Sequence, residues 1–421
     1  MIPHRFNTLR RLLYFINVVA AFTIVILLPF NLISITKYII GIYFFSWLLT
    51  VNLKIFYYRI LKYWLLVLPL FLFYMMHVIS ALYSSDFSFS FFDLQKKVSL
   101  LIIPLTFYNS TTFKKSNRIY LLKAFIWTTL ITVLIGFGNL IYLIMRNDYY
   151  ERLLYSHPHY LVYKYLSVFA HSTYFAMFLV FTVAVIIYLI FNQQKVKRIT
   201  ALRLVFGFFI IFTVIINSSR SGILSLAALL LFTLFFYVKG RIRWVSIFAI
   251  IAIFIIMIST NIRFQKYSKI IDLFHSSSSE IIENSQELIK GDVTRPIIWV
   301  ASVEVIRENF WFGVGNGDLK RAMKEKYKQY GVDDQLGGYF NPHNQFLSTF
   351  VMLGFTGFLI LLAVFIVPAI QALKKRQYLV LSFLLIVFVH ALTESIFGRL
   401  QGVIFFSFFY GLVMTFLPGS D

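Results

Sequence analysis

Hydrophobic residues occur in long runs separated by short polar stretches along nearly the whole chain. Runs of about 17 to 25 apolar residues can cross a hydrocarbon layer of about 30 Å as helices. The runs are continuous and do not alternate with polar residues, which is typical of membrane helices and not of barrel strands. They predict twelve spans, at residues 12–32, 37–53, 63–83, 95–109, 121–145, 170–191, 203–218, 221–238, 243–260, 343–370, 377–396 and 400–417.

The span at 95–109 has the weakest pattern, because it is short and begins beside Lys96 and Lys97. A count of eleven is therefore the alternative. Basic residues precede the first run and no small-residue cleavage site follows it, so we expect an uncleaved anchor and not a removable signal peptide.

Composition agrees with this pattern, since 59% of the 421 residues are hydrophobic and only 13% are charged. That is too little polar material to cover soluble domains of this total length. The predicted class is an all-α polytopic membrane protein with about 12 transmembrane helices. The chain has no cysteine, which excludes disulfides and thiolate metal sites.

The formal net charge of +22 comes from alternate short loops and not from one basic surface. The basic loops contain Arg5, Arg10 and Arg11; Lys54, Arg59 and Lys62; Lys114, Lys115 and Arg118; Lys195, Lys197, Arg198 and Arg203; Lys239, Arg241 and Arg243; and Lys374, Lys375 and Arg376. By the positive-inside rule these loops and both termini are cytoplasmic. Because the charges are scattered and lack a stripe of stacking aromatic residues, a nucleic-acid partner is not expected.

The chain divides into three parts on this reading. Residues 1–260 hold helices 1 to 9, residues 261–342 form a large outer loop with short helices, and residues 343–421 hold helices 10 to 12. The outer loop has equal numbers of acidic and basic residues, and its first half is rich in serine. In its second half, apolar residues at helical spacing predict a helix that begins at Pro296, with Arg295 just outside it, and ends near Asn309.

A glycine cluster, Gly313-Val314-Gly315-Asn316-Gly317, follows that helix. It resembles a dinucleotide fingerprint, but such a fingerprint needs a preceding buried strand, and none is predicted here. We therefore expect a tight turn in which backbone approaches backbone.

Three motifs place a cationic or titratable side chain at the start of a helix on the outer side. In the first, Ser218 or Ser219 caps the eighth span and Arg220 lies in its first turn. Free N–H groups beside a guanidinium form a phosphate receptor, although an arginine that reaches lipid headgroups explains this motif equally well. Arg295 is the second, and for it an ordinary surface arginine is the favoured alternative.

The third motif is Asn341-Pro342-His343-Asn344, in which Asn341 is the expected N-cap and His343 lies in the first turn of the tenth span. There we expect a neutral imidazole that can accept a proton, with an ordinary polar interfacial residue as the more frequent alternative.

Glu394 lies within the eleventh predicted span, where a carboxylate is costly unless it is paired or faces a polar cavity. A structural ion pair with Arg399 or Arg220 is as plausible as a catalytic role, and His390 lies four residues earlier on the same helix face. His171, at the outer start of the sixth span, is a weaker member of this group.

No metal site is predicted from the sequence. The chain has no HExxH motif, and His157 and His159 lack further ligands at a fixed spacing.

Taken in order, the motifs resemble the O-antigen ligase and O-antigen polymerase superfamily. The motifs are Ser219-Arg220-Ser221-Gly222, Arg295 with Trp299 four residues on, the glycine cluster at 313–317, His343-Asn344-Gln345-Phe346-Leu347, and Gly354 with Gly357. They cover about residues 200–360, and the predicted topology extends the resemblance over the whole chain.

The resemblance implies a membrane glycosyltransferase of the GT-C type in lipopolysaccharide biosynthesis. It would face the periplasm from the bacterial inner membrane and use no metal, cofactor or nucleotide sugar. Its donor would be a glycan on undecaprenyl pyrophosphate and its acceptor a sugar hydroxyl, in ligases that of lipid A core, with inversion at the anomeric carbon. Arg220 and Arg295 match the arginines that bind donor phosphates, and His343 matches the histidine that activates the acceptor. We expect Glu394, Asn344 and His171 to support them.

Ligases and polymerases share these motifs; ligase is the preferred hypothesis and polymerase the alternative. The protein O-glycosylating branch is disfavoured because no large soluble extension follows the last predicted span. A lipid-linked glycan transporter is less favoured, since transporters usually show repeats and ionisable groups near the bilayer midplane.

Overall fold

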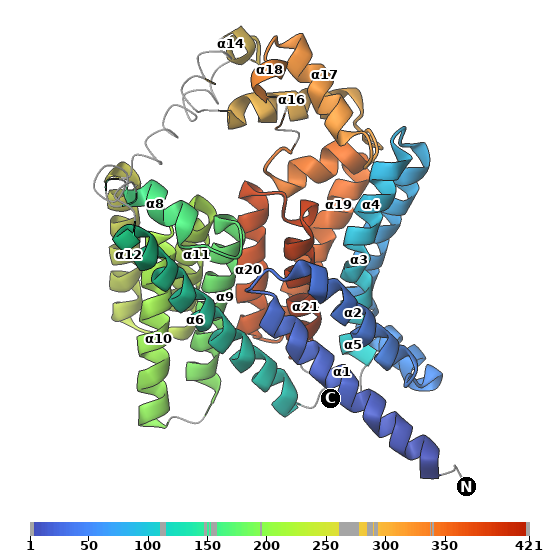
Figure 1. The fold of residues 1–421 in the computed structure, drawn as a ribbon, viewed down its shortest axis with the longest axis vertical. Coiled ribbons are helices and arrows are strands. Elements are labelled where there is room, and N and C mark those ends of the chain that lie inside the picture. Colours follow the sequence, from blue (N-terminus) through green and yellow to red (C-terminus); the bar gives the residue numbers. More distant parts are fainter. Residues whose placement is uncertain are drawn as a thin grey trace.

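The computed structural model describes residues 4–109, 115–146, 150, 152, 158–193, 196–260, 278–283, 289, 294–336, 338 and 341–417. All regular secondary structure in these residues is helical (Figure 1). The predicted all-α class is therefore confirmed.

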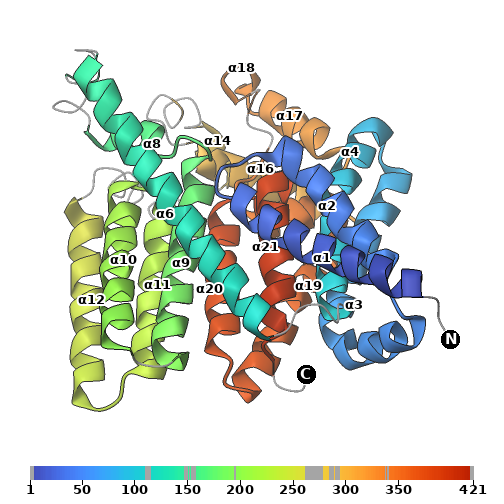
Figure 2. The ribbon, with the colours of Figure 1, turned by 60° about the horizontal axis from the view of Figure 1, so that its bottom comes forward.

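Seven helices in the described residues are long and apolar enough to cross a membrane. They are α1 (His4–Leu27), α3 (Leu53–Tyr83), α6 (Lys115–Arg146), α9 (Ser172–Asn192), α10 (Lys197–Ile216), α11 (Arg220–Tyr237) and α19 (Gln345–Lys374). Shorter apolar helices are α2 (Ile33–Leu48), α20 (Tyr378–Thr393) and α21 (Leu400–Met414). A further helix, α12 (Arg241–Thr260), stands at the edge of the bundle beside α10 and α11 (Figure 2). The chain is a multi-pass membrane protein.

The span predicted at 95–109 falls on two helices. They are α4 (Phe87–Lys97), which begins at the N-cap Asp86, and α5 (Ser99–Asn109). Each has 11 residues and so covers about 16 Å, roughly half of a hydrocarbon core. The pattern missed α4 because Asp93 and Lys97 interrupt its apolar residues. Both side chains are nevertheless buried, and they form an ion pair with each other.

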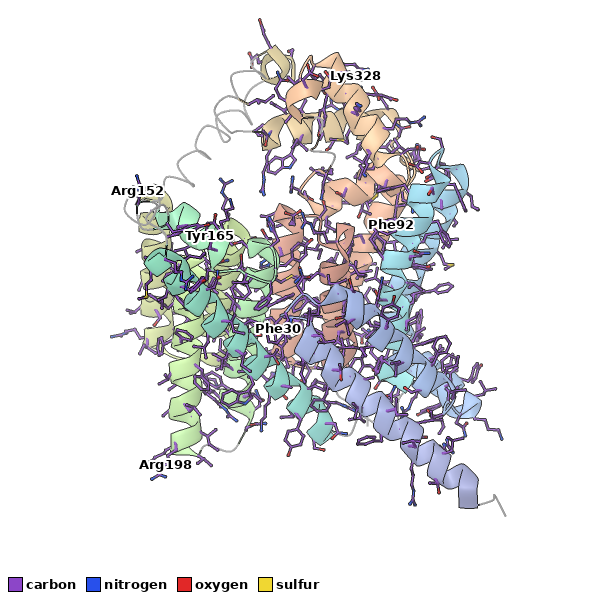
Figure 3. All side chains as sticks on the ribbon, viewed as in Figure 1. Phe30, Phe92, Arg152, Tyr165, Arg198 and Lys328 are labelled. Carbon is purple, nitrogen blue, oxygen red and sulfur yellow. The ribbon has the colours of Figure 1, made fainter. Side chains whose placement is uncertain are left out.

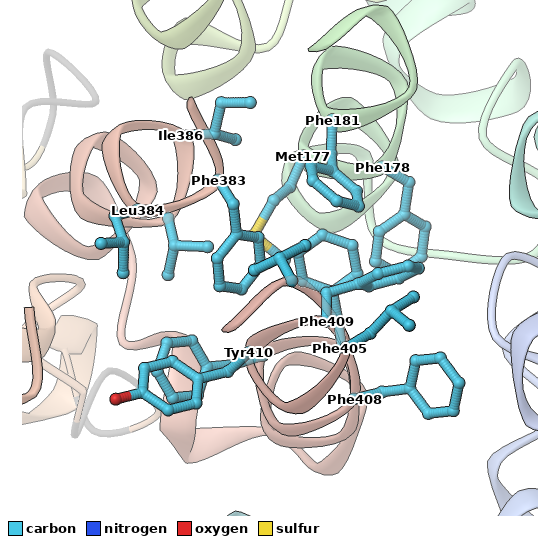
Figure 4. Packing of buried hydrophobic residues seen from close by; sticks show 14 of the residues in the cluster. Met177, Phe178, Phe181, Phe383, Leu384, Ile386, Phe405, Phe408, Phe409 and Tyr410 are labelled. Carbon is cyan, nitrogen blue, oxygen red and sulfur yellow. The ribbon is translucent and has the colours of Figure 1, made fainter. Parts of the chain in front are cut away.

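Aromatic side chains fill the centre of the bundle between α9, α20 and α21 (Figure 4). Phe181 and Phe409 have ring centroids 4.6 Å apart, and Phe383 and Phe405 pack beside them. Edge-to-face and tilted pairs of this kind add to the stabilisation that comes from area burial alone. The packing fixes the relative position of the three helices whose ends carry the site described below.

The two ends of the bundle differ. The chain enters α1 and leaves α21 at one end, where the labelled Arg198 also lies (Figure 3). We call this the basic end. Lys328 marks the opposite end, which is covered by α14 (Ser278–Glu283), α16 (Arg295–Glu308), α17 (Leu319–Gln329) and α18 (Asp333–Leu336) (Figures 1 and 3). The short helix α8 (Pro158–Tyr165) also lies toward this end.

Helices α16, α17 and α18, here called the outer segment, share a small hydrophobic core of their own. Its buried side chains include Ile297, Ile298, Ala301, Met323 and Tyr327. The predicted helix before Asn309 is thus present, and its apolar face packs on the rest of the outer segment and on α19.

The glycine cluster fixes the outer segment to the bundle through backbone contacts, as the sequence predicted. Helix α19 is interrupted at Gly354, which has φ 65° and ψ −165°. The interruption frees carbonyl groups, and the N–H groups of Val314 and Gly315 donate to the oxygens of Val351 and Met352, both at 2.9 Å. The Phe355 N–H donates in the other direction to the Phe310 carbonyl at 2.7 Å.

A second attachment joins the outer segment to the turn between α3 and α4. The Asp318 carboxylate accepts hydrogen bonds from the Ser85 N–H at 2.8 Å and from the Ser85 hydroxyl at 2.7 Å. Gly317 lies against this turn, and its N–H donates to the Ser84 hydroxyl at 3.1 Å. Together these contacts hold the loop that precedes α19 in a fixed place above the bundle.

Candidate active site

His343 lies in the loop that enters α19 and not in the first turn of the helix, so that expectation is wrong. The N-cap is Asn344, whose side chain accepts hydrogen bonds from the N–H groups of Phe346 and Leu347 at 2.9 and 3.1 Å. His343 itself has φ 49°, a left-handed conformation that non-glycine residues adopt infrequently. Strain of this kind is kept only where the surroundings determine it, and it often marks a functional position.

Asn341, the expected N-cap, has a different role. Its side-chain oxygen accepts hydrogen bonds from the His343 N–H at 3.1 Å and from the Ser395 hydroxyl. The Ser348 and Ser395 hydroxyls are 2.6 Å apart, which ties the loop to the first turn of α19. This network of Asn341, Ser348 and Ser395 fixes the backbone that carries His343. Ser395 was missed from the sequence, where its only signal was its position directly after Glu394.

Glu394 is the residue that ends α20, so its expected place within the helix is also corrected. Its carboxylate pairs with His343, whose Nδ1 lies 3.2 Å from Oε1 and 3.3 Å from Oε2. Glu394 is only 7% exposed. The structure thus pairs Glu394 with His343, a partner that the sequence analysis did not consider for this carboxylate. The helix ends here because Glu394 and the residues after it are extended before the 3-10 turn η1 (Ile396–Gly398).

Electrostatics keep Glu394 ionised. Burial alone would raise the pKa of this carboxyl, but the hydrogen bond and charge of His343 outweigh burial and bring the pKa below its ordinary value. Arg295 and His171 act in the same direction from further away. A negative carboxylate beside an imidazole orients the ring and stabilises the imidazolium that forms when the ring accepts a proton.

His171 is brought to the same site from α9. It is the N-cap residue of that helix, and its Nδ1 accepts a hydrogen bond from the Thr173 N–H at 3.4 Å. Partial burial lowers the pKa of His171, and the nearby positive charge of Arg399 lowers it further. Glu394 opposes this shift, which shows that the two side chains lie within electrostatic reach of each other.

Arg220 begins α11, and of the two predicted caps, Ser218 and Ser219, it is Ser219 that caps the helix. The Ser219 hydroxyl accepts from the Gly222 N–H at 3.5 Å. The loop before Arg220 is attached to the start of α9, because Asn217 exchanges two hydrogen bonds with Ser172, each 3.2 Å long. Arg220 therefore lies near the helix end that carries His171.

Arg295 is the first residue of α16, one position earlier than expected, and Pro296 follows it inside the first turn. Four residues on, the Trp299 ring N–H donates to the Pro342 carbonyl at 3.0 Å. This bond connects the helix that carries Arg295 to the loop that carries His343. The electrostatic effect of Arg295 on Glu394 places the guanidinium charge near the His343 pair.

Asn344 supports the site as a helix cap, as described above. Within the described residues no three His, Asp or Glu side chains come together as metal ligands would. His157, one of the two histidines considered for zinc, lies outside the described residues, as does the first half of the outer loop up to residue 277.

Comparison with known families adds to this geometry. Residues 205–362 match a family model described as O-antigen ligase. The match covers less than half of the chain. The match supports the superfamily that the sequence motifs indicated, and it implies a glycosyltransferase-like membrane enzyme of the ligase or polymerase type. No curated protein matches the chain in a sequence comparison.

The matched residues extend from α10 to α19 and include Arg220, Arg295 and His343. Glu394 and His171 lie outside the matched residues and are brought to the site by α20 and α9. The site is thus formed by the matched domain together with helices on both sides of it.

Proposed function

We propose that this protein transfers a glycan from undecaprenyl pyrophosphate to a sugar hydroxyl of lipid A core, as an O-antigen ligase. The proposal depends above all on one observation, the buried carboxylate of Glu394 held 3.2 Å from the strained His343. A histidine oriented by a carboxylate is a general base, and a hydroxyl acceptor needs one. The reaction would take place at the periplasmic face of the bacterial inner membrane.

The proposed reaction is a single displacement. The acceptor oxygen attacks the anomeric carbon of the donor sugar while His343 takes the hydroxyl proton. The new C–O bond forms as the bond from the anomeric carbon to the pyrophosphate oxygen breaks, and the bonding pair leaves with undecaprenyl pyrophosphate. Attack from the face opposite the leaving group inverts the anomeric configuration.

The arginines would stabilise the departing pyrophosphate. Arg295 and Arg220 each occupy the first position of a helix, where N–H groups and the helix dipole also favour an anion. Charge stabilisation of the leaving group is usually a large contribution to catalysis. Because pyrophosphate is already a good leaving group, two guanidinium groups supply what the step needs, and we propose a metal-independent reaction.

The outer segment would form one wall of the site. The Trp299–Pro342 hydrogen bond and the backbone contacts at Gly354 fix this segment relative to His343. A fixed wall helps to hold the acceptor in position, and positioning alone contributes strongly to rate when two substrates must meet.

Reconstitution tests the proposal directly. Purified full-length protein is incubated with a lipid-linked O-antigen glycan and lipid A core, and the products are separated. Ligase activity gives glycan on core and free undecaprenyl pyrophosphate. Longer glycan still on the lipid carrier would instead identify a polymerase, and unchanged substrates with folded protein would overturn both. His343→Ala should lower the rate of glycan transfer by a factor of about 10² to 10⁴.

A further inference from the structure

A cavity of about 450 Å³ lies between α6, α9 and α10, far from the His343 site. Its lining includes Lys123, Trp127, Leu189, Arg203 and Phe206. His171 caps the site end of α9, whereas Leu189 is close to the other end of that helix. At 1.5 Å per residue the cavity is about 25 to 30 Å from the site along α9. It therefore belongs to the basic end of the bundle, where Arg198 lies (Figure 3).

Two basic side chains, Lys123 and Arg203, line this cavity, and no acidic residue is among its lining residues. Arg203 is fixed in place, because its Nη1 donates to the Leu189 carbonyl at 2.8 Å and its Nη2 donates to the Gln193 side-chain oxygen at 2.5 Å. These bonds use two of the five guanidinium donors and leave the others available. Lys123 lies over the Tyr120 ring with its nitrogen 5.5 Å from the centroid. Neither Lys123 nor Arg203 has an acidic group within 4 Å in the part of the chain that the structure describes.

Like charges that line one cavity repel each other, and an anion between them removes the repulsion. A hydrated small anion would gain little from the rest of the lining, which is mostly apolar. The charge of the cavity thus predicts an anionic ligand, and its walls predict that the ligand also has an apolar part.

The open side of the cavity lies on the apolar surface of the bundle, where membrane lipids would contact the protein. Trp127 and Leu202 are 54% and 48% exposed, and other large apolar side chains of α10 are exposed beside them. The Trp127 and Phe206 rings meet edge to face with centroids 5.4 Å apart, which forms an aromatic wall. Tryptophan is enriched at the membrane–water interface, the depth at which a lipid headgroup meets its acyl chains.

We propose that this cavity binds an anionic phospholipid. Its phosphate lies between Lys123 and Arg203, and the first part of one acyl chain lies along Trp127 and Phe206. A phospholipid fits better than a polyprenyl-linked donor, because the donor must present its phosphates at the other end of the bundle. The preference for a phospholipid over a polyprenyl-linked donor rests on the proposed function, whereas the binding of an anionic lipid to this cavity does not.

Lipid binding to the purified full-length protein is the test. The protein is delipidated in detergent and titrated with phosphatidylglycerol or phosphatidylcholine, and bound lipid is counted by native mass spectrometry. Wild-type protein should bind phosphatidylglycerol at least about tenfold more tightly than phosphatidylcholine. Lys123→Gln should reduce this preference to about twofold. Lys62→Gln, which removes an exposed lysine on α3 at the same end, should leave it unchanged.

Further measurements distinguish a phospholipid site from other kinds of site. Equal binding of the two lipids, or equal loss in Lys123→Gln and Lys62→Gln, would overturn the proposal. Displacement of the lipid by inorganic phosphate alone would show a simple anion site and would also overturn it. Tighter binding of undecaprenyl phosphate than of phosphatidylglycerol would assign the cavity to the polyprenyl carrier instead. Arg203→Lys, which keeps the charge, should retain more of the preference than Arg203→Gln, and thermal unfolding of each variant checks that it folds.

Discussion

Nδ1 of His343 lies 3.2 Å from Oε1 of Glu394, although the two residues are 51 positions apart in the chain. The contact joins the loop that enters α19 to the residue that ends α20. One ring nitrogen is therefore occupied by the carboxylate, and in the proposed function the other takes the proton of the acceptor hydroxyl. This is the relationship between a general base and the group that orients it.

Glu394→Gln should lower kcat about a hundredfold and change KM little. The amide keeps the size of the side chain but cannot stabilise the imidazolium, and a hundredfold loss is the low end of what a positioned base contributes. Glu394→Asp should restore part of the rate, because it restores the charge. Glu325→Gln, at a residue whose side chain is 63% exposed on α17, is the matched control and should leave transfer unchanged. An equal rise in KM for both substrates would indicate a merely structural role.

The double variant with His343→Ala and Glu394→Gln should transfer glycan at nearly the same rate as His343→Ala alone. If Glu394 acts through His343, its effect disappears when the ring is absent, since residues that act as a unit are not additive. Transfer rates of the two single variants and the double variant, measured under one set of conditions, give the coupling. Multiplicative losses would show that the two residues act independently.

The lowered pKa of Glu394 predicts a stability effect at acid pH. A carboxyl whose pKa is lower in the folded chain contributes stability above its unfolded pKa of about 4.3 and loses it as the pH falls through the folded value. The difference in unfolding midpoint between the wild type and Glu394→Gln should therefore shrink from pH 5 to pH 3. A difference that grows over this range would contradict the assignment of the lowered pKa.

The sequence predicted which of these residues lie near helix starts more accurately than it predicted their exact positions and partners. His343 and Arg220 were found from motifs at helix starts, and Ser219 was correctly named as a cap. The start of α19 was misplaced because Asn341 and Asn344 are both good N-cap residues. What decides between them is a tertiary contact, the hydrogen bond from Ser395 to Asn341, which no local pattern reveals.

The same limit explains α4. Apolar periodicity cannot show that Asp93 and Lys97 will pair inside the bundle, so the predicted span began only at residue 95 and missed most of α4. The contact of Glu394 with His343 could not be predicted for a related reason. The two residues are far apart in the sequence, and His343 has a left-handed backbone conformation that no local pattern indicated.

Gly354→Ala should loosen the outer segment. A Cβ there would clash with the backbone of Phe312 and Trp311, and the residue has φ 65°, so side chain and backbone are both strained. We expect a loss of about 2 kcal/mol or more in stability and faster proteolytic cleavage within residues 294–336. Gly41→Ala in α2 is the matched control, since nothing lies within 4 Å of its added Cβ and alanine favours the helix by about 1 kcal/mol. Equal proteolysis of the two variants would show that the interruption at Gly354 does not fix the segment.

The Asp93–Lys97 pair gives a prediction about stability away from the site. Asp93 and Lys97 are 4% and 1% exposed, and the Asp93 carboxylate also lies 3.0 Å from Lys96 and 3.7 Å from Nδ1 of His77. Lys97→Met leaves a buried carboxylate with weaker partners, and breaking a buried pair typically costs about 3 to 5 kcal/mol. The double variant Asp93→Asn with Lys97→Met removes both charges together and should be more stable than Lys97→Met alone.

Thermal or denaturant unfolding of the purified protein measures these differences. Glu325→Gln on α17 is the exposed counterpart, because Glu325 and its partner Arg321 are both 63% exposed and 4.0 Å apart. It should change stability by no more than about 1 kcal/mol. If Lys97→Met were as mild as Glu325→Gln, water would have to reach Asp93 in the folded protein. Helix α4 would then border a hydrated space, and water would stabilise the charge of Asp93 in place of Lys97.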